Sequence, residues 1–352
     1  MKKFILKLTF LLVPILLFVV SVNFIGDASN LFSIGYEEKI ADQIIKGNNV
    51  TNIYNYNERL LNKYLITKFN FCPDVLAIGS SRVMLINSSY FNNKTFFNTG
   101  VSGASIEDLM STYQMYEQKK CLPKRIILGL DPWTLNINNG QMRWSTLNHE
   151  YLILYNQLTG NNIVAKEELV NSTYLQLISL SYFKISFKKL ISGRRNTPIS
   201  TTIKTNNTFT KILDGSISYD LKYRSVTAAE IEEKCTIYTS GDIYGVEKFD
   251  EHSTEIRFLL EKFIEHLRKN NIEISIFLAP YHPKVYSFIS KSDKYRKIIE
   301  SESYFIDLGL KYEIEVLGSF NPNKLNMDGS YFYDGMHCNE KGIEKILKNE
   351  IK

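Results

Sequence analysis

Between residues 74 and 135, short apolar runs alternate with a helix-like segment, and this alternation restricts the fold more than any other feature. The runs DVLAIG (74–79), TFFNTG (95–100) and KRIILGLD (124–131) lack polar alternation, as expected of strands covered on both faces. SIEDLMSTYQMYEQ (105–118) carries apolar residues at helical spacing. Strands that alternate with helices predict a mainly parallel sheet with right-handed crossovers, and therefore an α/β fold.

The same rhythm returns toward the end of the chain. A long amphipathic helix (253–271) precedes the strand IEISIFLA (272–279), a short strand YFID (304–307) follows, and NEKGIEKILKNEI (339–351) is a last helix. From about 140 to 245, helical and then polar, threonine- and asparagine-rich sequence interrupts the rhythm. We interpret this stretch as an insertion over the carboxyl edge of the sheet.

The N-terminal 29 residues read as a membrane anchor. Three lysines lie among the first seven residues, and an apolar run follows from about Leu8 to Ile25. About 18 apolar residues are long for the central region of a signal peptide and sufficient to cross a bilayer. No clear small-residue cleavage motif follows, although SVN and DAS leave cleavage open. We therefore expect a retained transmembrane helix at 1–29.

The lysines indicate the orientation of the anchor. They precede the apolar run and none follows immediately, which predicts a cytoplasmic N-terminus and an extracytoplasmic remainder. No later segment is apolar enough to span again, so a single-pass membrane protein is expected. Residues 30–73 are asparagine-rich with helical patches and read as a juxtamembrane lead-in, packed on a domain that covers 74–352.

Composition and cysteines add two constraints. The chain of 352 residues is 44% hydrophobic, enough for a large core, and its net charge of +5 is scattered, which makes nucleic acid an unexpected partner. Cys72 and Cys121 each precede a predicted strand, so they suit a disulfide if those strands are parallel neighbours. Pairing of Cys235 with Cys338 stays open, as does a set of four buried thiols.

The first predicted strand ends at Gly79 in a polar corner. Ser80, Ser81 and Arg82 follow it, and an apolar pattern that resumes at Val83 suggests a short helix facing inward. In open α/β sheets, ligands and catalytic groups collect at such carboxyl ends. The plain alternative is a serine that caps a helix.

A catalytic serine needs a base and a group that orients it. Among five histidines, His337 is the best candidate because YDGMHCNEKG places Asp334 three residues before it, where one turn can set the carboxylate against the ring. His282 follows a buried strand in APYHP and is expected to line the site. The other three lie in polar or helical, surface-like contexts.

Four short blocks together resemble the SGNH (GDSL-like) hydrolase superfamily. They are the Gly-x-Ser corner, NTGVSGAS after the second strand, GLD after the third, and Asp-x-x-His before the last helix. The chain is most similar to membrane-anchored SGNH-like proteins of bacterial cell envelopes, relatives of those that O-acetylate exopolysaccharides or D-alanylate teichoic acids. The resemblance covers roughly 74–135 and 270–350. It implies a three-layer αβα sandwich, flavodoxin-like in arrangement, and a mechanism without metal or cofactor.

The resemblance assigns roles to single residues. Ser81 matches the nucleophile, and Ser80 stands where the family usually has aspartate. His337 matches the general base and Asp334 its orienting acid. Gly103 in VSGAS matches the glycine whose N–H helps to hold the oxyanion.

One position departs from the family pattern. Where the family places an asparagine that donates to the oxyanion, GLDPW has Asp131, and an ionised carboxylate repels a developing negative oxygen. Losing one such donor raises the activation free energy by about 2.7–4 kcal/mol. Either Asp131 is protonated, another donor substitutes, or activity is weak or absent. We hypothesise that Arg82 pairs with Asp131; Asn98 is a further candidate donor, with a turn cap as its alternative.

These features lead to one functional expectation and two alternatives. We expect an esterase or acyltransferase that acts on O-acyl groups of an envelope polysaccharide or lipid-linked glycan, with Trp133 suiting sugar stacking or core packing alike. The first alternative is a non-catalytic scaffold or glycan-binding partner of a membrane O-acyltransferase. The second is an ordinary secreted esterase, which leaves the anchor unexplained. No residue cluster has the spacing of a metal site.

Overall fold

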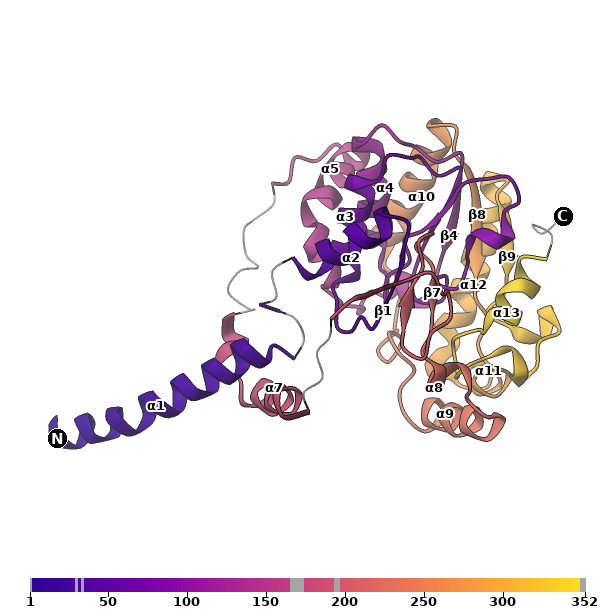
Figure 1. Cartoon of the computed structure of the whole chain (residues 1–352). Helices are drawn as coiled ribbons and strands as arrows, with labels where there is room; N and C mark the ends of the chain where they lie inside the picture. The colour runs from indigo at the N-terminus through magenta and orange to yellow at the C-terminus, as the bar shows by residue number, and fades with distance from the viewer. Residues whose placement is uncertain (1, 29–30, 33–34, 165–173, 193–196, 349–352) are drawn as a thin grey trace.

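A five-stranded parallel sheet lies at the centre of the molecule (Figure 1). The computed structural model describes residues 2–28, 31–32, 35–164, 174–192 and 197–348. In spatial order the strands are β3 (Phe96–Asn98), β2 (Val75–Ile78), β4 (Arg125–Gly129), β8 (Glu273–Leu278) and β9 (Glu315–Gly318). The predicted α/β fold with a parallel sheet is confirmed, and the strand order reverses between β2 and β4.

The two faces of the sheet are covered differently. One face packs Leu76, Ile126 and Ile276 beneath a helical layer. Its members include α3 (Glu58–Lys68), α4 (Ile106–Gln118), α10 (Thr254–Lys269) and α12 (Arg296–Tyr312). The other face packs Ala77 and Phe277 against α13 (Glu340–Ile346) and irregular segments. Loops from the layers on both faces therefore meet at the carboxyl ends of the strands.

A small antiparallel sheet joins the insertion to the lead-in. Its order is β5 (Ile199–Thr201), β1 (Asn49–Thr51), β6 (Thr210–Lys211) and β7 (Ile217–Ser218). The structure also describes α2 (Tyr36–Ile45), α5 (Asn148–Thr159), α8 (Leu221–Arg224), α9 (Ala228–Ser240) and α11 (Pro283–Ser290) in the body. Part of the predicted insertion, 165–173 and 193–196, lies outside the described residues.

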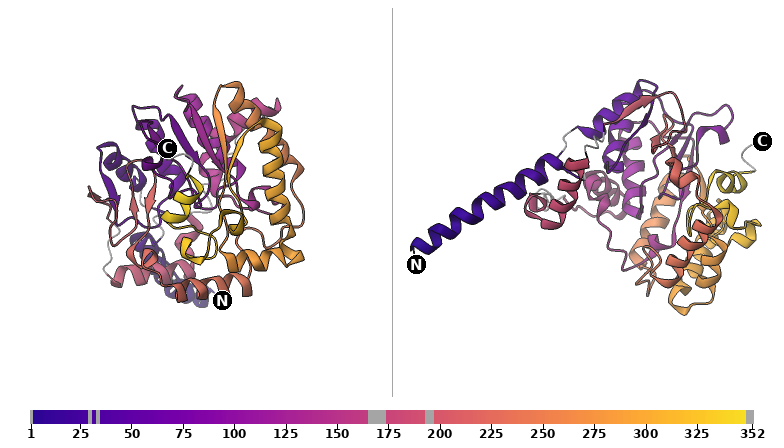
Figure 2. Two further views of the ribbon diagram at one scale, coloured as in Figure 1. Left: turned by 90° about the vertical axis from the view of Figure 1, so that its right-hand side faces the viewer. Right: turned by 60° about the horizontal axis from the view of Figure 1, so that its bottom comes forward.

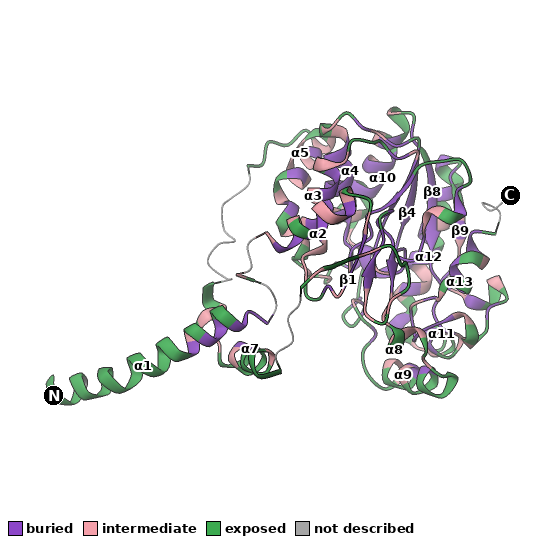
Figure 3. Ribbon diagram, in the orientation of Figure 1, coloured by how far each residue is buried: buried purple, intermediate pink, exposed green. Residues whose placement is uncertain are grey.

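The N-terminal helix α1 (Lys2–Gly26) projects from this body (Figures 1 and 2). Among the described residues it is the one helix long and apolar enough to cross a membrane. Its free part is exposed, whereas its last turns are partly buried (Figure 3). There it contacts α7 (Leu180–Ser192), which lies beside its C-terminal end.

Two local predictions were wrong. Residues 81–85 form turns instead of a helix, although Val83 is buried as expected. A Cβ on Gly79 would lie 3.0 Å from both the Gly129 Cα and a Val83 methyl, so the glycines let this turn pack on the strand ends. YFID (304–307) lies inside α12 because its apolar residues face the core at helical spacing. The last strand is instead β9, EVLG.

The Cys72–Cys121 disulfide, which the sequence left open, is present. Cys72 and Cys121 are bonded, and β2 pairs directly with β4, so the two cysteines lie at one edge of the sheet. Cys235 and Cys338 are free and buried. Burial raises the pKa of the Cys338 thiol to about 12, which keeps that thiol protonated and unreactive at neutral pH.

Candidate active site

Three side chains from opposite ends of the domain form one hydrogen-bonded chain. Ser81 Oγ lies 2.9 Å from His337 Nε2. His337 Nδ1 lies 2.9 Å from Asp334 Oδ2 and 3.1 Å from Oδ1. A carboxylate at Nδ1 requires the proton on that nitrogen, which leaves Nε2 free to accept the serine proton. This is the geometry of a nucleophile, a base and an orienting acid.

The spacing Asp-x-x-His closes a single turn. Asp334 Oδ1 accepts hydrogen bonds from the backbone N–H groups of Met336 and His337, both at 2.8 Å. Tyr333 N–H donates to the His337 carbonyl at 2.9 Å. The carboxylate therefore fixes the backbone of the loop and the orientation of the imidazole together.

Tyr223, from α8 of the insertion, is a member of this network that the sequence did not reveal. Its hydroxyl donates to Asp334 Oδ2 at 2.5 Å. Burial raises the pKa of the Asp334 carboxyl, but the neighbouring His337 and the hydrogen bonds from His337, Tyr223 and Met336 outweigh it and hold the pKa well below its usual range. Asp334 therefore stays ionised.

Arg82 pairs with Asp131, as hypothesised. The Arg82 Nη1 to Asp131 Oδ1 distance is 2.9 Å, and the two side chains are 1% and 5% exposed. Arg82 Nε donates to the Met336 carbonyl at 3.1 Å, and its Nη2 donates to the carbonyls of Ala279 and Pro280. One guanidinium thus ties together the ends of β2, β4 and β8 and the loop that carries His337. All three guanidinium nitrogens of Arg82 are engaged in these contacts, and the Asp131 carboxylate accepts from Arg82 instead of donating.

Two backbone N–H groups are available to donate hydrogen bonds to an oxyanion. Within the described part of the chain, the N–H groups of Ser81 and Gly103 donate no hydrogen bond. The Val101 N–H to Gly79 carbonyl bond, 3.0 Å, sets their loops side by side. Gly103 has φ of +57°, and the Tyr244 hydroxyl and the Arg143 guanidinium crowd its Cα. Sequence reasoning missed both side chains because they lie in the insertion, outside the matched blocks.

The lead-in supports the Gly103 loop. Glu58 of α3 accepts hydrogen bonds from the N–H and hydroxyl of Ser102. Arg59 makes a buried pair with Asp108, with Nε to Oδ1 at 2.7 Å and Nη2 to Oδ2 at 2.8 Å. Asp108 also caps α4 by accepting from Ser105 N–H at 3.0 Å. Helix α3 therefore holds the loop that would receive an oxyanion.

Asn98 is not an oxyanion donor. Both hydrogens of its side-chain amide are engaged, with Nδ2 2.8 Å from the carbonyls of Val83 and Ile86. Its Oδ1 accepts from Gly100 N–H at 2.8 Å. The alternative prediction, a turn cap, is the correct one. Trp133 is likewise a core residue, 1% exposed, with its indole N–H donating to the Ala104 carbonyl at 3.0 Å.

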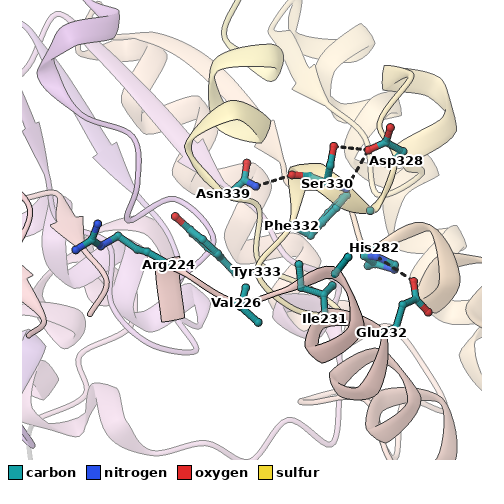
Figure 4. Close-up of a pocket in the computed structure, with 12 residues that line it drawn as sticks. Arg224, Val226, Ile231, Glu232, His282, Asp328, Ser330, Phe332, Tyr333 and Asn339 are labelled. Atoms are coloured by element: carbon teal, nitrogen blue, oxygen red, sulfur yellow. Dashed lines mark hydrogen bonds and ion pairs between the residues drawn. The ribbon is translucent and has the colours of Figure 1, made fainter. Parts of the chain in front are cut away.

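His282 lines a neighbouring cavity instead of touching the triad (Figure 4). The cavity holds about 520 Å³ between α9 and the loop 328–333, and neither Ser81 nor His337 lines it. His282 Nδ1 accepts from Lys284 N–H at 3.2 Å, whereas its buried Nε2 has no hydrogen-bond partner among the described residues. Burial lowers the pKa of His282, so the ring is neutral at pH 7.

Comparison with known proteins adds no family assignment: no protein-family model matches the chain, and no curated protein matches it in sequence. Over the residues that the structure describes, no group of three or more His, Cys, Asp or Glu side chains could hold a metal ion.

Proposed function

We propose that this protein is a membrane-anchored SGNH-like serine esterase or acyltransferase that acts on O-acyl groups of a cell-envelope polysaccharide or glycolipid. The observation that carries the proposal is the Ser81–His337–Asp334 chain, with both of its links at 2.9 Å. The strand order supports it. Numbered along the main sheet the order is 2-1-3-4-5, that of flavodoxin-like folds, whose ligands bind where the order reverses. Ser81 lies at that point.

The proposed reaction follows from the placement of the protons. Ser81 Oγ attacks the ester carbonyl while His337 Nε2 takes its proton, and Asp334 stabilises the imidazolium that forms. The oxyanion of the tetrahedral intermediate accepts hydrogen bonds from the N–H groups of Ser81 and Gly103. As the intermediate collapses, His337 returns the proton to the leaving alcohol. A sugar hydroxyl or water then attacks the acyl-serine and restores the free enzyme.

Two features support a site held at the extracytoplasmic face of a membrane. The last turns of α1 are docked on the protein, with Val19, Val22 and Asn23 buried, as expected of a retained helix. The Cys72–Cys121 disulfide suits an oxidising compartment. An anchored site favours a polymeric or lipid-linked substrate over a free metabolite.

A fluorophosphonate probe on the full chain in detergent tests the proposal. The probe should label the wild type and the Ser80→Ala variant but not Ser81→Ala. Ser80 is the matched control because it is the adjacent serine, fully buried, with its Oγ accepting from Arg82 N–H at 3.2 Å. Labelling that persists in Ser81→Ala, or no labelling of a folded wild type, overturns the catalytic assignment. Release of acetate from an acylated glycan then identifies the substrate.

A second candidate function is favoured by the Arg82–Asp131 pair, which occupies the position of the missing asparagine donor. A scaffold or glycan-binding partner of a membrane O-acyltransferase would need no such donor. A folded wild type that the probe does not label, together with co-purification of an acyltransferase, would favour this candidate.

A further inference from the structure

Helix α7 presents an apolar face that no described part of the body covers. Successive residues of a helix are separated by about 100°. At that spacing five apolar side chains of α7 fall within a single arc of about 100°. They are Leu180, Phe183, Phe187, Leu190 and Ile191. Leu180 and Ile191 are 68% and 71% exposed, and Lys184 and Lys188 lie along one edge of the arc. This is the pattern of a helix that lies in a membrane interface.

The opposite face of α7 is fastened to the C-terminal end of α1. The Tyr182 hydroxyl donates to Asp27 Oδ1 at 2.9 Å, and Lys189 Nζ donates to the Asp27 carbonyl at 2.7 Å. A Cβ on Gly26 would lie 2.7 Å from the Ser186 carbonyl oxygen, so the backbones approach closely. Helix α7 is therefore held against α1 in one orientation.

The preceding 3₁₀ turn (Gln176–Ile178) accepts hydrogen bonds from the polar end of α1. Asn23 is fully buried, and its amide lies 3.1, 2.8 and 3.1 Å from the carbonyls of Gln176, Leu177 and Ser179. An NH₂ group without acceptors would be costly at a membrane boundary, and these carbonyls supply them, whereas Asn23 Oδ1 has no hydrogen-bond partner among the described residues. Ile178 of the same turn is 54% exposed and extends the apolar surface.

The apolar surfaces of the two helices are continuous. Phe18 of α1 and Phe183 of α7 have ring centroids 5.8 Å apart, and Phe183 stacks on Phe187 at 5.6 Å. Phe18 is itself 56% exposed. A lipid that covers α1 at this level would therefore also meet α7.

The length of α1 sets the depth of this contact. A hydrocarbon core of about 30 Å takes about 20 residues of helix. The apolar run of α1 extends from about Leu8 to Ile25, so the outer boundary of the core lies near Ile25. Phe18 precedes Ile25 by seven residues and lies about 10 Å inside that boundary along the helix axis, at the deep end of the about 5–10 Å by which an interfacial helix buries its apolar face.

We propose that α7 is a second membrane contact, an interfacial helix that lies in the outer boundary of the bilayer crossed by α1. The occupant of its apolar face is lipid, with Lys184 and Lys188 directed to the headgroups. The proposal rests on the membrane placement of α1 and is independent of the chemistry at Ser81. Together α1 and α7 would fix the tilt of the body, and hence the direction in which the site faces the membrane.

Depth-dependent quenching by brominated lipids tests this proposal on the full chain in vesicles. Phe187→Trp adds a fluorophore to the α7 face, and Leu180→Trp is a second variant in case the first does not fold. Phe258→Trp is the matched control, since Phe258 is 50% exposed on α10, apart from α1 (Figure 1). We expect bromine near the headgroup end of the acyl chain to quench the added fluorescence in α7 at least twofold more than in the control.

Equal quenching in α7 and in the control overturns the proposal. So does protection of the α7 fluorophore from both bromolipid and aqueous iodide, if that protection appears only at a high protein-to-lipid ratio. In that case a second copy of the chain would cover the apolar face. Phe10→Trp, at a position 76% exposed on α1, reports the anchor separately. If bromolipid quenches Trp at position 10 but not in α7, α1 still spans the membrane and the proposal that α7 is an interfacial helix is overturned. Probe labelling of Ser81 in the same vesicles shows that either result is independent of the proposed catalysis.

Discussion

At the scale of single residues, Arg82 is the group on which the site geometry depends most. Its guanidinium contacts Asp131, two carbonyls after β8, and the Met336 carbonyl next to His337. A buried ion pair that loses one partner leaves an uncompensated charge, whereas a pair left intact contributes little net stability. The role of Asp131 can therefore be tested by removing only its charge.

We expect Asp131→Asn to lower the free energy of unfolding by about 3–5 kcal/mol, because the Arg82 charge stays buried without its partner. Esterase activity or probe labelling should fall as well, since Arg82 also holds the loop of His337. Urea unfolding and labelling rates measure the two effects. A faster reaction at unchanged stability would mean that Asp131 hinders an oxyanion instead of bracing the loop.

Tyr223→Phe tests a positioning role at the same scale. The Tyr223 hydrogen bond is one of the causes that lower the Asp334 pKa, so its removal raises that pKa and moves the loss of activity at low pH toward higher pH. A hydrogen bond to a charged group contributes about 1.5–3 kcal/mol, and we expect kcat to fall while KM changes little. The pH profile of kcat measures the shift.

Tyr219→Phe is the matched control for that variant. Its ring centroid lies 4.4 Å from that of Tyr223, and Tyr219 makes no hydrogen bond to Asp334 among the described residues. It should leave the pH profile unchanged. An identical shift in both variants would assign the effect to packing of the aromatic cluster.

At the scale of elements, what the sequence predicts follows from length and periodicity. The helix at 254–269 and the strand at 273–278 were predictable because a long 3.6-residue pattern and an uninterrupted apolar run leave little ambiguity. The strands of the small sheet have two or three residues each, too few for any period to emerge. Their pairing depends on contacts between segments about 150 residues apart.

The residues of the candidate site likewise differ in whether the local sequence predicts them. Ser81, His337, Asp334 and the Arg82–Asp131 pair were predictable because each lies at a strand end or a loop with a local signature. Tyr223 lies on a helix of four residues in the insertion and carries no local sign of its contact with Asp334. Arg143 and Tyr244 meet Gly103 only through the tertiary fold.

Lys211 in β6 offers an element-scale test with a defined pH dependence. It is 2% exposed, and burial lowers its pKa to about 8, against an ordinary value of 10.5. Because the folded-state pKa is the lower one, protonation favours the unfolded chain, and the penalty is fully present below pH 8 and fades as pH rises to about 10.5. Lys211→Met should therefore stabilise the protein by roughly 1–3 kcal/mol at pH 7.

The difference in unfolding free energy between Lys211→Met and the wild type, measured by urea at pH 7 and pH 10, checks this prediction. The difference should shrink at the higher pH. A variant that is less stable than the wild type at pH 7 would show that the Lys211 Nζ hydrogen bond to the Gly215 carbonyl, 2.5 Å, outweighs the cost of burying the charge.

At the scale of the whole molecule, the α1–α7 pair and the part of the chain that carries the candidate site have separate cores. Both buried hydrophobic clusters of the body are built from residues after 35, and no described residue of α1 or α7 belongs to either. The α1–α7 contact instead has its own small set of partners around Asp27. Anchoring and chemistry are therefore expected to be separable.

A chain that lacks residues 1–28 tests this separation. Because sites without shared partners influence each other by only about 0.3–0.5 kcal/mol, we expect the rate of fluorophosphonate labelling at Ser81 to stay within about twofold of the full chain. Membrane retention should fall sharply, because the interfacial helix α7, with 13 residues, binds a membrane far more weakly than a transmembrane helix does. The uncovered Tyr182 side of α7 adds to its apolar face, so the truncated protein should self-associate with increasing concentration, as measured by analytical ultracentrifugation. A labelling rate that falls tenfold or more in a folded, monomeric truncation would mean that α1 helps to shape the site, and the division of the molecule into two independent parts would be wrong.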